Sequence, residues 1–239
     1  MIYRNTLLLI TLYFISFTLS SQDIWSPLES MKIKSISQTE ISNDGKSVAY
    51  VVREPIMEGK KSEYLSQIWV TDIESKENIQ YTFNQKSSSS PKFSPDGKKI
   101  AFLSSRSGKN QIWIINTLGG EARMLTKEKK GIRSIKWSPD GKTISFLKSD
   151  DDTEDEIKSK ENKTDVILVD KNFKYSHIYS YHLDDDTVTQ VTSGNYSVNS
   201  FDYSPNGKKI IFSHQEDTNI NTGFINTDIS VIDSDGKNL

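Results

Sequence analysis

Four copies of one ten-residue segment constrain the fold of this chain more than any other feature. One copy reads Phe-Ser-Pro-Asp-Gly-Lys-Lys-Ile-Ala-Phe at residues 93–102, and related segments occupy 41–50, 137–146 and 203–212. Their starts are separated by 52, 44 and 66 residues. A repeat of this length is typical of arrays in which each copy builds one small β-sheet plus loops.

Each copy predicts a chain reversal followed by a strand. Proline sets φ at the entry to the turn, Asp or Asn caps the turn through its side chain, and Gly takes the positive φ. After the turn, apolar residues stand two apart, which places each pair on one face of a strand. The pairs are Val48 and Tyr50, Ile100 and Phe102, Ile144 and Phe146, and Ile210 and Phe212. We expect them in the core of each unit, where a buried aromatic contributes about 1.5–3 kcal/mol.

The segments between the copies supply two further strands per unit. Third strands are predicted at 67–72, 111–116, 177–182 and 227–232, and closing strands end at residues 82, 126 and 192. Four strands per repeat form one blade, and radially arranged blades predict an all-β fold, namely a partial β-propeller of four-stranded antiparallel blades. The chain supplies three full blades and most of a fourth. The blades are expected at about 39–83, 91–126, 133–192 and 198–239, within an incomplete propeller spanning 39–239. Because propellers close with about four to eight blades and an open stack leaves unpaired edges, we expect this to be the front portion of a longer protein.

The N-terminal segment has the pattern of a targeting signal. Arg4 and the free amine precede an apolar stretch at 7–19, followed by Ser20 and Ser21. Residues 1–21 are therefore predicted to be a secretory signal peptide, with the mature protein periplasmic or secreted. An uncleaved anchor and a buried core strand are the alternatives, although a stable membrane span needs roughly 20 apolar residues. Residues 22–38 form a lead-in segment in which Ser26, Pro27 and Glu29 predict a short helix.

Composition excludes several function classes. The chain has 30 Lys and Arg against 32 Asp and Glu, so no global positive field exists and nucleic acid is disfavoured as a partner. It has 0 Cys, which excludes disulfides, thiolate metal sites and a cysteine nucleophile. A chain without thiols remains compatible with export.

Catalytic motifs are not found in the sequence. No two glycines stand four apart around a serine, as the nucleophile elbow of a serine hydrolase requires. The histidines are His177, His182 and His214, and none lies beside a nucleophile or a second ligand at metal-binding spacing. His177 and His182 are five apart in a strand pattern and are expected on opposite faces. We assign no catalytic, cofactor-binding or metal-ligating residue and expect no cofactor.

Charged runs and tryptophans also have structural interpretations. The acidic runs 150–152 and 154–156 are expected in a long loop of the third blade, and they lack the residue order of a calcium loop. Residues 233–236 are interpreted as a hairpin turn and the lysine-rich stretch 127–130 as a solvated loop. Trp69, Trp113 and Trp137 recur at strand positions, which favours core or inter-blade packing over a ligand platform.

The segment 93–102, together with 111–116 and 125–126, resembles the propeller repeat shared by the TolB translocation protein and the prolyl oligopeptidase family. TolB-like proteins carry an α/β domain before the propeller, whereas about 17 residues separate the predicted signal from the first blade here. That layout favours the peptidases. Segments 164–170, 175–179, 201–205 and 212–214 are similar to exported acylaminoacyl-peptidase or dipeptidyl-peptidase members.

The resemblance implies a propeller that precedes an α/β-hydrolase domain bearing Ser, Asp and His and admits only short peptides to it. No residue of this chain matches those catalytic positions. The paired glutamates that bind a substrate amine in some dipeptidyl peptidases are also not matched by 154–156, which favours the acylaminoacyl or dipeptidyl-peptidase-five-like branch. The expected function is thus the gating and substrate-access portion of an exported serine peptidase that hydrolyses short peptides, with further blades and the hydrolase domain as its partners. The alternatives are a non-enzymatic periplasmic TolB-like propeller that binds protein partners, and a degenerate truncated copy.

Overall fold

The computed structural model describes residues 26–58, 61–164, 173–216 and 226–238. The chain divides into two compact units, residues 1–34 and 35–239, which are described separately. In the first unit, the helix α2 (Pro27–Met31) begins after Ser26, whose side chain accepts a hydrogen bond from the N–H of Glu29 at 3.2 Å. The local capping pattern thus predicted the start of this helix correctly. Residues 1–21, predicted as a signal peptide, lie outside the described residues.

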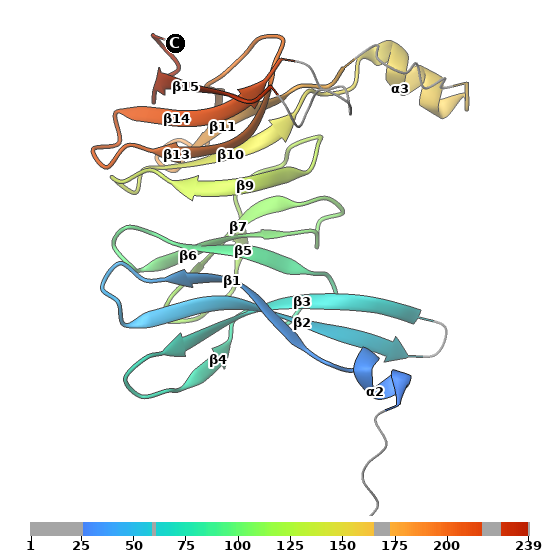
Figure 1. The fold of residues 1–239 in the computed structure, drawn as a ribbon, viewed down its shortest axis with the longest axis vertical. Helices are drawn as coiled ribbons and strands as arrows, with labels where there is room; N and C mark the ends of the chain where they lie inside the picture. The colour runs from blue at the N-terminus through green and yellow to red at the C-terminus, as the bar shows by residue number, and fades with distance from the viewer. Residues whose placement is uncertain (1–25, 59–60, 165–172, 217–225, 239) are drawn as a thin grey trace, which may run out of the picture. The chain divides into compact units, whose positions relative to one another are not determined.

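The described part of the second unit contains four antiparallel sheets, each with its strands in chain order. Sheet 1 consists of β1 (Ser35–Ile41), β2 (Ser47–Glu58), β3 (Lys61–Asp72) and β4 (Asn78–Gln80). Sheet 2 consists of β5 (Ser88–Phe93), β6 (Lys99–Ser104), β7 (Gln111–Asn116) and β8 (Arg123–Met124). Sheet 3 consists of β9 (Ile132–Trp137), β10 (Thr143–Ser149), β11 (Ser176–His182) and β12 (Val188–Gln190), and sheet 4 of β13 (Ser197–Tyr203), β14 (Lys209–Gln215) and β15 (Asp228–Asp233). The predicted all-β architecture of four-stranded antiparallel blades is confirmed (Figure 1).

The repeated segment forms the turn between the first two strands of every sheet. In sheet 2 the carboxylate of Asp96 accepts hydrogen bonds from the hydroxyl of Ser94 at 2.6 Å and from the N–H of Lys98 at 3.1 Å. These bonds lower the pKa of Asp96. Gly97 has a φ of +70°, a conformation that glycine adopts without strain. The same contacts recur at residues 42–46, 138–142 and 204–208.

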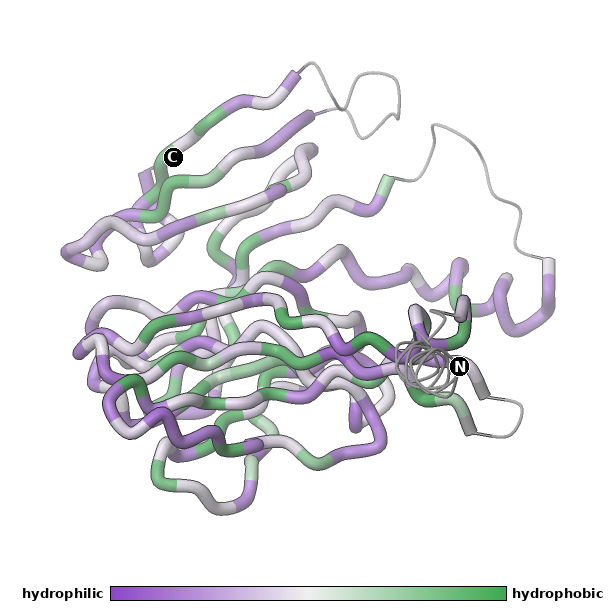
Figure 2. Tube along the Cα trace, turned by 60° about the horizontal axis from the view of Figure 1, so that its bottom comes forward, coloured by the Kyte–Doolittle hydropathy of each residue, from purple (hydrophilic) through white to green (hydrophobic). Residues whose placement is uncertain are grey.

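The hydrophobic core lies between consecutive sheets, which corrects the expectation of a core inside each unit. We call the face of a sheet that carries the Ile-x-Phe pair its front face and the opposite face its rear face. The front-face residues Ile100 and Phe102 of sheet 2 pack on rear-face residues of sheet 1, among them Val51 and Ile68. Sheets 2 and 3 are therefore apolar on both faces, and Figure 2 shows hydrophobic residues within the strands and hydrophilic ones at the turns.

Sheet 1 departs from the predicted burial pattern. Its front-face residues Val48 and Tyr50 are half-buried, whereas the alternate residues Ala49 and Val51 are 0% and 2% exposed. The prediction that Val48 and Tyr50 form part of the core was wrong, because no described sheet covers this face.

A helix interrupts the segment that joins β10 to β11. The acidic run at 154–156 was predicted to lie in a loop, but it forms the first turn of α3 (Glu154–Glu161). The hydroxyl of Thr153 accepts the N–H of Glu156, and the Glu156 carboxylate accepts the N–H of Thr153 at 2.7 Å. This capping box and the acidic first turn, which complements the helix dipole, explain why a charged run becomes helical.

Candidate functional site

Two of the three histidines are brought together between sheets 3 and 4. The ring centroid of Tyr196 lies 5.4 Å from that of His177 and 4.8 Å from that of His214. His182 is on the opposite face of β11, as predicted from its spacing, and its Nε2 is 2.9 Å from the hydroxyl of Thr189. Among the described residues, no group of three or more acidic or histidine side chains could hold a metal ion.

His177 occupies a position that is glutamine in the first two sheets. Gln111 accepts a hydrogen bond from the hydroxyl of Thr126 at 2.8 Å, and Gln67 makes the same bond to Thr82. In sheet 3, His177 Nδ1 is 3.4 Å from the hydroxyl of Thr192. His177 is 3% exposed, and burial lowers its pKa despite the opposing charge of Asp150. The geometry favours a packing role in closing the sheet.

The acidic runs and the lysine-rich stretch form ion pairs with one another. Asp152 accepts Lys130 at 2.7 Å and Lys160 at 3.0 Å, and these bonds lower its pKa to about 2. Lys148 is buried and binds Glu128 at 2.8 Å. Residues 127–130 form a loop with exposed or half-exposed side chains, as expected, and the ion pairs of Lys130 and Glu128 also attach this loop to the segment that carries α3.

The remaining candidates lie in turns and between sheets. Residues 233–236 form a turn in which the N–H of Gly236 donates to the carbonyl of Asp233 at 2.8 Å. Trp113 packs on the core between sheets 1 and 2, and Trp137 on the core between sheets 2 and 3. Trp69 belongs to the front face of sheet 1, where it is half-buried.

The first strands of the sheets form a surface that the sequence patterns did not single out. Strands β1, β5, β9 and β13 of consecutive sheets contact one another, and we call the edge that they form the inner edge. At equivalent positions the inner edge carries only polar or charged side chains, and none of them is buried. They are Ser37, Gln38 and Glu40 in β1; Ser89, Ser90 and Lys92 in β5; Arg133, Ser134 and Lys136 in β9; and Asn199, Ser200 and Asp202 in β13.

A β-bulge at one position of each first strand presents this polar set. The pairing register with the second strand shifts at 37–40, 89–92, 133–135 and 198–200. At the first three bulges Gln38, Ser90 and Ser134 have φ values of 53°, 54° and 50°. Left-handed backbone at residues other than glycine is costly, and bulges that recur near binding sites re-aim side chains. The period-two pattern breaks here, which is why sequence reasoning missed this edge.

Ion pairs and side-chain caps join neighbouring first strands. Lys92 pairs with Glu40 of the preceding sheet, and Lys136 pairs with Asp202 of the following sheet at 2.9 Å. The N–H of Ser90 donates to Gln38 Oε1 at 2.7 Å, and the indole N–H of Trp137 donates to the Lys92 carbonyl at 3.0 Å. Polar side chains thus provide hydrogen-bond partners for some backbone groups of the strand edge. The resulting surface is hydrophilic and its charges are paired.

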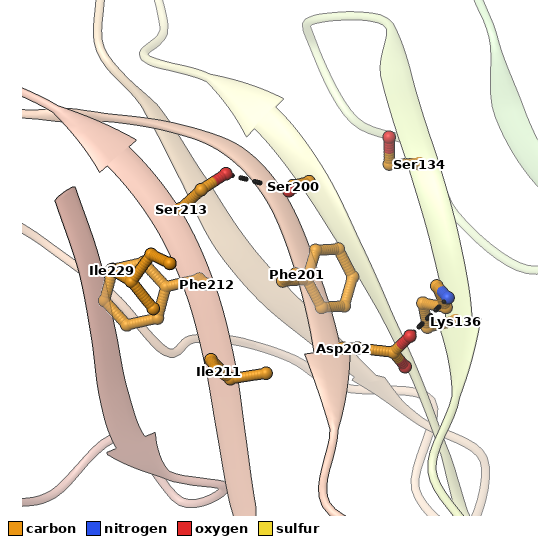
Figure 3. A pocket seen from close by; sticks show the side chains of 9 residues that line it. All are labelled: Ser134, Lys136, Ser200, Phe201, Asp202, Ile211, Phe212, Ser213 and Ile229. Carbon is orange, nitrogen blue, oxygen red and sulfur yellow. Dashed lines mark hydrogen bonds and ion pairs between the residues drawn. The ribbon is translucent and has the colours of Figure 1, made fainter. Parts of the chain in front are cut away.

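A hollow of about 450 Å³ lies between β9 and sheet 4. Ser134 and Lys136 of β9 line one side, and strands β13, β14 and β15 line the other (Figure 3). The pair Lys136–Asp202 and the hydroxyl contact of Ser200 with Ser213, at 2.8 Å, are its polar part. Ile211 and Ile229 make the rest of its wall apolar.

Four-stranded sheets whose first strands gather at one edge and whose cores lie between sheets define the chain as a β-propeller protein. Residues 40–174 match the TolB beta propeller domain family, and the chain belongs to that family.

A curated relative carries the name of a peptidase. The chain is 34% identical over 76 residues to the "Uncharacterized peptidase YuxL" of Bacillus subtilis (strain 168). The matched region covers 32% of this chain and 11% of that protein. The chain therefore spans about a ninth of the length of this curated relative.

Solved structures share the fold at low sequence identity. The acylaminoacyl peptidase of Pyrococcus horikoshii superposes with a TM-score of 0.64 at 22% identity, over 87% of this chain and 32% of that one. TolB from Acinetobacter baumannii superposes with a TM-score of 0.55 at 19% identity, over 83% of this chain and 41% of that one. Among the described residues, no helix is long and apolar enough to cross a membrane.

Proposed function

We propose that this chain is the front portion of the propeller of an exported serine peptidase that cleaves short peptides, and that its inner edge lines the route by which peptides reach the catalytic domain. The observation that carries the proposal is the relationship to a peptidase at 34% identity, of which the chain spans 11%. In this proposal residues 1–21 are the secretory signal, residues 22–38 the lead-in, and the propeller begins near residue 39. The catalytic serine, aspartate and histidine belong to a hydrolase domain outside this chain.

The inner edge supports a role in peptide passage. First strands of propeller blades surround a central channel, so the polar set of the inner edge would face the channel contents. A polar wall exchanges hydrogen bonds with a hydrated peptide without the desolvation cost that an apolar wall imposes. Capped backbone groups such as the Ser90 N–H also reduce the tendency of a passing peptide to pair with the strand edge.

A second candidate is a non-enzymatic TolB-like propeller that binds protein partners. It is favoured by the match of residues 40–174 to the TolB beta propeller domain family. In this case the inner edge would bind a partner and would not pass a substrate.

The coding sequence downstream of Leu239 separates the two candidates. Further repeats of the turn motif followed by Gly-x-Ser-x-Gly support the peptidase. The full-length protein should then be labelled by a fluorophosphonate and should cleave chromogenic dipeptide or acyl-amino-acid substrates. A stop codon soon after the last propeller repeat, with no labelling of the full-length product, would overturn the peptidase in favour of the binding protein.

A further inference from the structure

A second hollow, of about 440 Å³, lies at the end of sheet 2 where the chain turns from β6 into β7. The turn forms one side of it, and β8 with the segment that follows forms the other. Its lining includes Lys109, Gln111, Met124, Lys127, Glu128 and Lys129. We call it the lysine pocket.

Hydrogen bonds hold the two sides of the lysine pocket together. The buried side chain of Gln111 accepts the hydroxyl of Thr126 at 2.8 Å and the N–H of Glu128 at 2.9 Å, and its amide donates to the Glu128 carbonyl at 2.9 Å. Across the pocket, Lys109 Nζ donates to the Lys129 carbonyl at 2.6 Å. The backbone that carries the lysines is therefore fixed, although their side chains are exposed.

The positive charge of the lysine pocket has no counterpart in its own lining. Glu128 is the only acidic side chain there, and its carboxylate lies 2.8 Å from Nζ of the buried Lys148. The carboxylate of Asp151, 3.7 Å from the same Nζ, also faces Lys148. Among the residues that the structure describes, no ion pair involves the three lysines that line the pocket, Lys109, Lys127 and Lys129.

The packing shared by the blades does not require lysine at these positions. Thr82, Thr126 and Thr192 are equivalent, because each hydroxyl accepts the N–H of the second residue of the same segment of the third strand at 2.9 Å. Counted from these contacts, the residues equivalent to the three lysines are uncharged in the neighbouring sheets. They are Leu65, Phe83 and Gln85 in sheet 1, and Tyr175, Ser193 and Asn195 in sheet 3. The cluster of cations is thus a feature of sheet 2 among the first three sheets.

Three ammonium groups around one hollow favour an anion as its occupant. Like charges repel one another, and an anion between them removes this repulsion. A lysine ammonium acts as a point charge with three donors, whereas arginine offers a planar fork that selects one geometry. Recognition by lysines alone therefore depends mainly on the charge of the ligand and suits the oxygens of phosphates and carboxylates alike. The volume lies within the range of small-molecule sites, about 300–1,000 Å³.

We propose that the lysine pocket of sheet 2 binds a small oxyanion that carries two or more negative charges, such as a diphosphate or a tricarboxylate. Lys109, Lys127 and Lys129 provide the charge, and Gln111 fixes the backbone that positions two of them. The site is separate from the inner edge, and its binding does not depend on a peptidase activity.

Calorimetric titration of the purified 239-residue chain with pyrophosphate and with citrate tests the proposal. We expect saturable binding of both and weaker binding of acetate, which has a single charge. The double variant Lys127→Gln and Lys129→Gln should bind at least tenfold more weakly. The matched control is Lys98→Gln with Lys142→Gln, which removes two exposed lysines from the turns between first and second strands and should leave binding unchanged. Circular dichroism establishes that each variant folds.

Lysine acetylation followed by mass spectrometry locates the bound anion. Pyrophosphate should slow the acetylation of Lys127 and Lys129 and leave the rates at Lys98 and Lys142 unchanged. Binding should also weaken between about 0.1 M and 1 M NaCl, where the screening length falls from about 10 Å to about 3 Å.

Two outcomes would overturn the proposal. One is the absence of saturable binding of either multivalent anion to the folded chain. The other is an equal loss of binding in the two double variants, or equal protection of all four lysines from acetylation, which would mean that anions associate with exposed lysines in general and not with this pocket.

Discussion

At the residue scale, the substitution of histidine for glutamine in sheet 3 introduces a titratable group into a repeated contact. Gln111 and Thr126 close sheet 2 with a neutral hydrogen bond, whereas His177 and Thr192 make the corresponding contact in sheet 3. Because His177 is buried and its pKa is lowered, folding favours the neutral ring.

Stability should therefore depend on pH through His177. Below about pH 6.5 the unfolded chain binds a proton at this histidine that the folded chain resists, so the free energy of unfolding falls as the pH decreases through that value. The loss levels off below the folded-state pKa. Urea midpoints at pH 7.5 and pH 5.0 measure it, and His177→Gln should reduce the difference between them. His182→Gln, whose side chain is only half-buried, is the control, and an equal reduction in both variants would contradict the assignment.

The buried cation Lys148 is the second residue-scale feature with a measurable consequence. Burial by itself would lower the pKa of Lys148, but the hydrogen bond to Glu128 and its charge outweigh burial, and the pKa is raised. The ammonium also lies 4.4 Å from the Tyr179 ring centroid. Glu128→Gln leaves this cation without its main partner and should cost about 1–3 kcal/mol in urea unfolding. Glu154→Gln, on the exposed helix, should cost less than about 0.5 kcal/mol, and similar losses in the two variants would show that the pair is unimportant.

At the scale of elements, the repeat predicted the turns and second strands because proline, Asp or Asn, and glycine have fixed roles at a reversal. It did not predict the bulges, since Gln38, Ser90 and Ser134 share no residue type that marks left-handed backbone. The repeat also led to a wrong position for the core. A strand that is buried on both faces has consecutive apolar residues, as from Ile100 to Leu103, and such a run does not indicate which neighbouring sheet covers which face. The helix α3 was missed because its charged residues resemble a solvated run.

A β-branched side chain should be tolerated less well at Ser90, in the bulge of β5, than at the neighbouring residue Ser89. Ser90 has a φ of 54°, a backbone conformation in which a β-branched residue is strained. Ser89 does not have a positive φ. Ser90→Val should cost about 1–3 kcal/mol, and Ser89→Val should stay within about 0.5 kcal/mol. Thermal unfolding of the two variants gives the comparison. Equal stabilities would mean that the strand shifts register without cost.

At the scale of the whole molecule, stability is expected to be highest in the middle of the array. Each sheet is stabilised by the sheets on its two faces, as in other repeat architectures where nearest-neighbour interfaces supply much of the stability. Sheets 2 and 3 have both faces covered, whereas sheet 4 exposes Ile229 and Val231 on its rear face. Opening sheet 4 therefore exposes less new apolar surface than opening sheet 2 or 3 and should cost less free energy.

Amide hydrogen exchange followed by mass spectrometry should reveal this gradient. Strands β6 and β10, which contain the buried Phe102 and Phe146, should exchange slowest, and β14 and β15 should exchange faster. Uniform protection across β6, β10, β14 and β15 would show that sheet 4 needs no neighbour on its rear face.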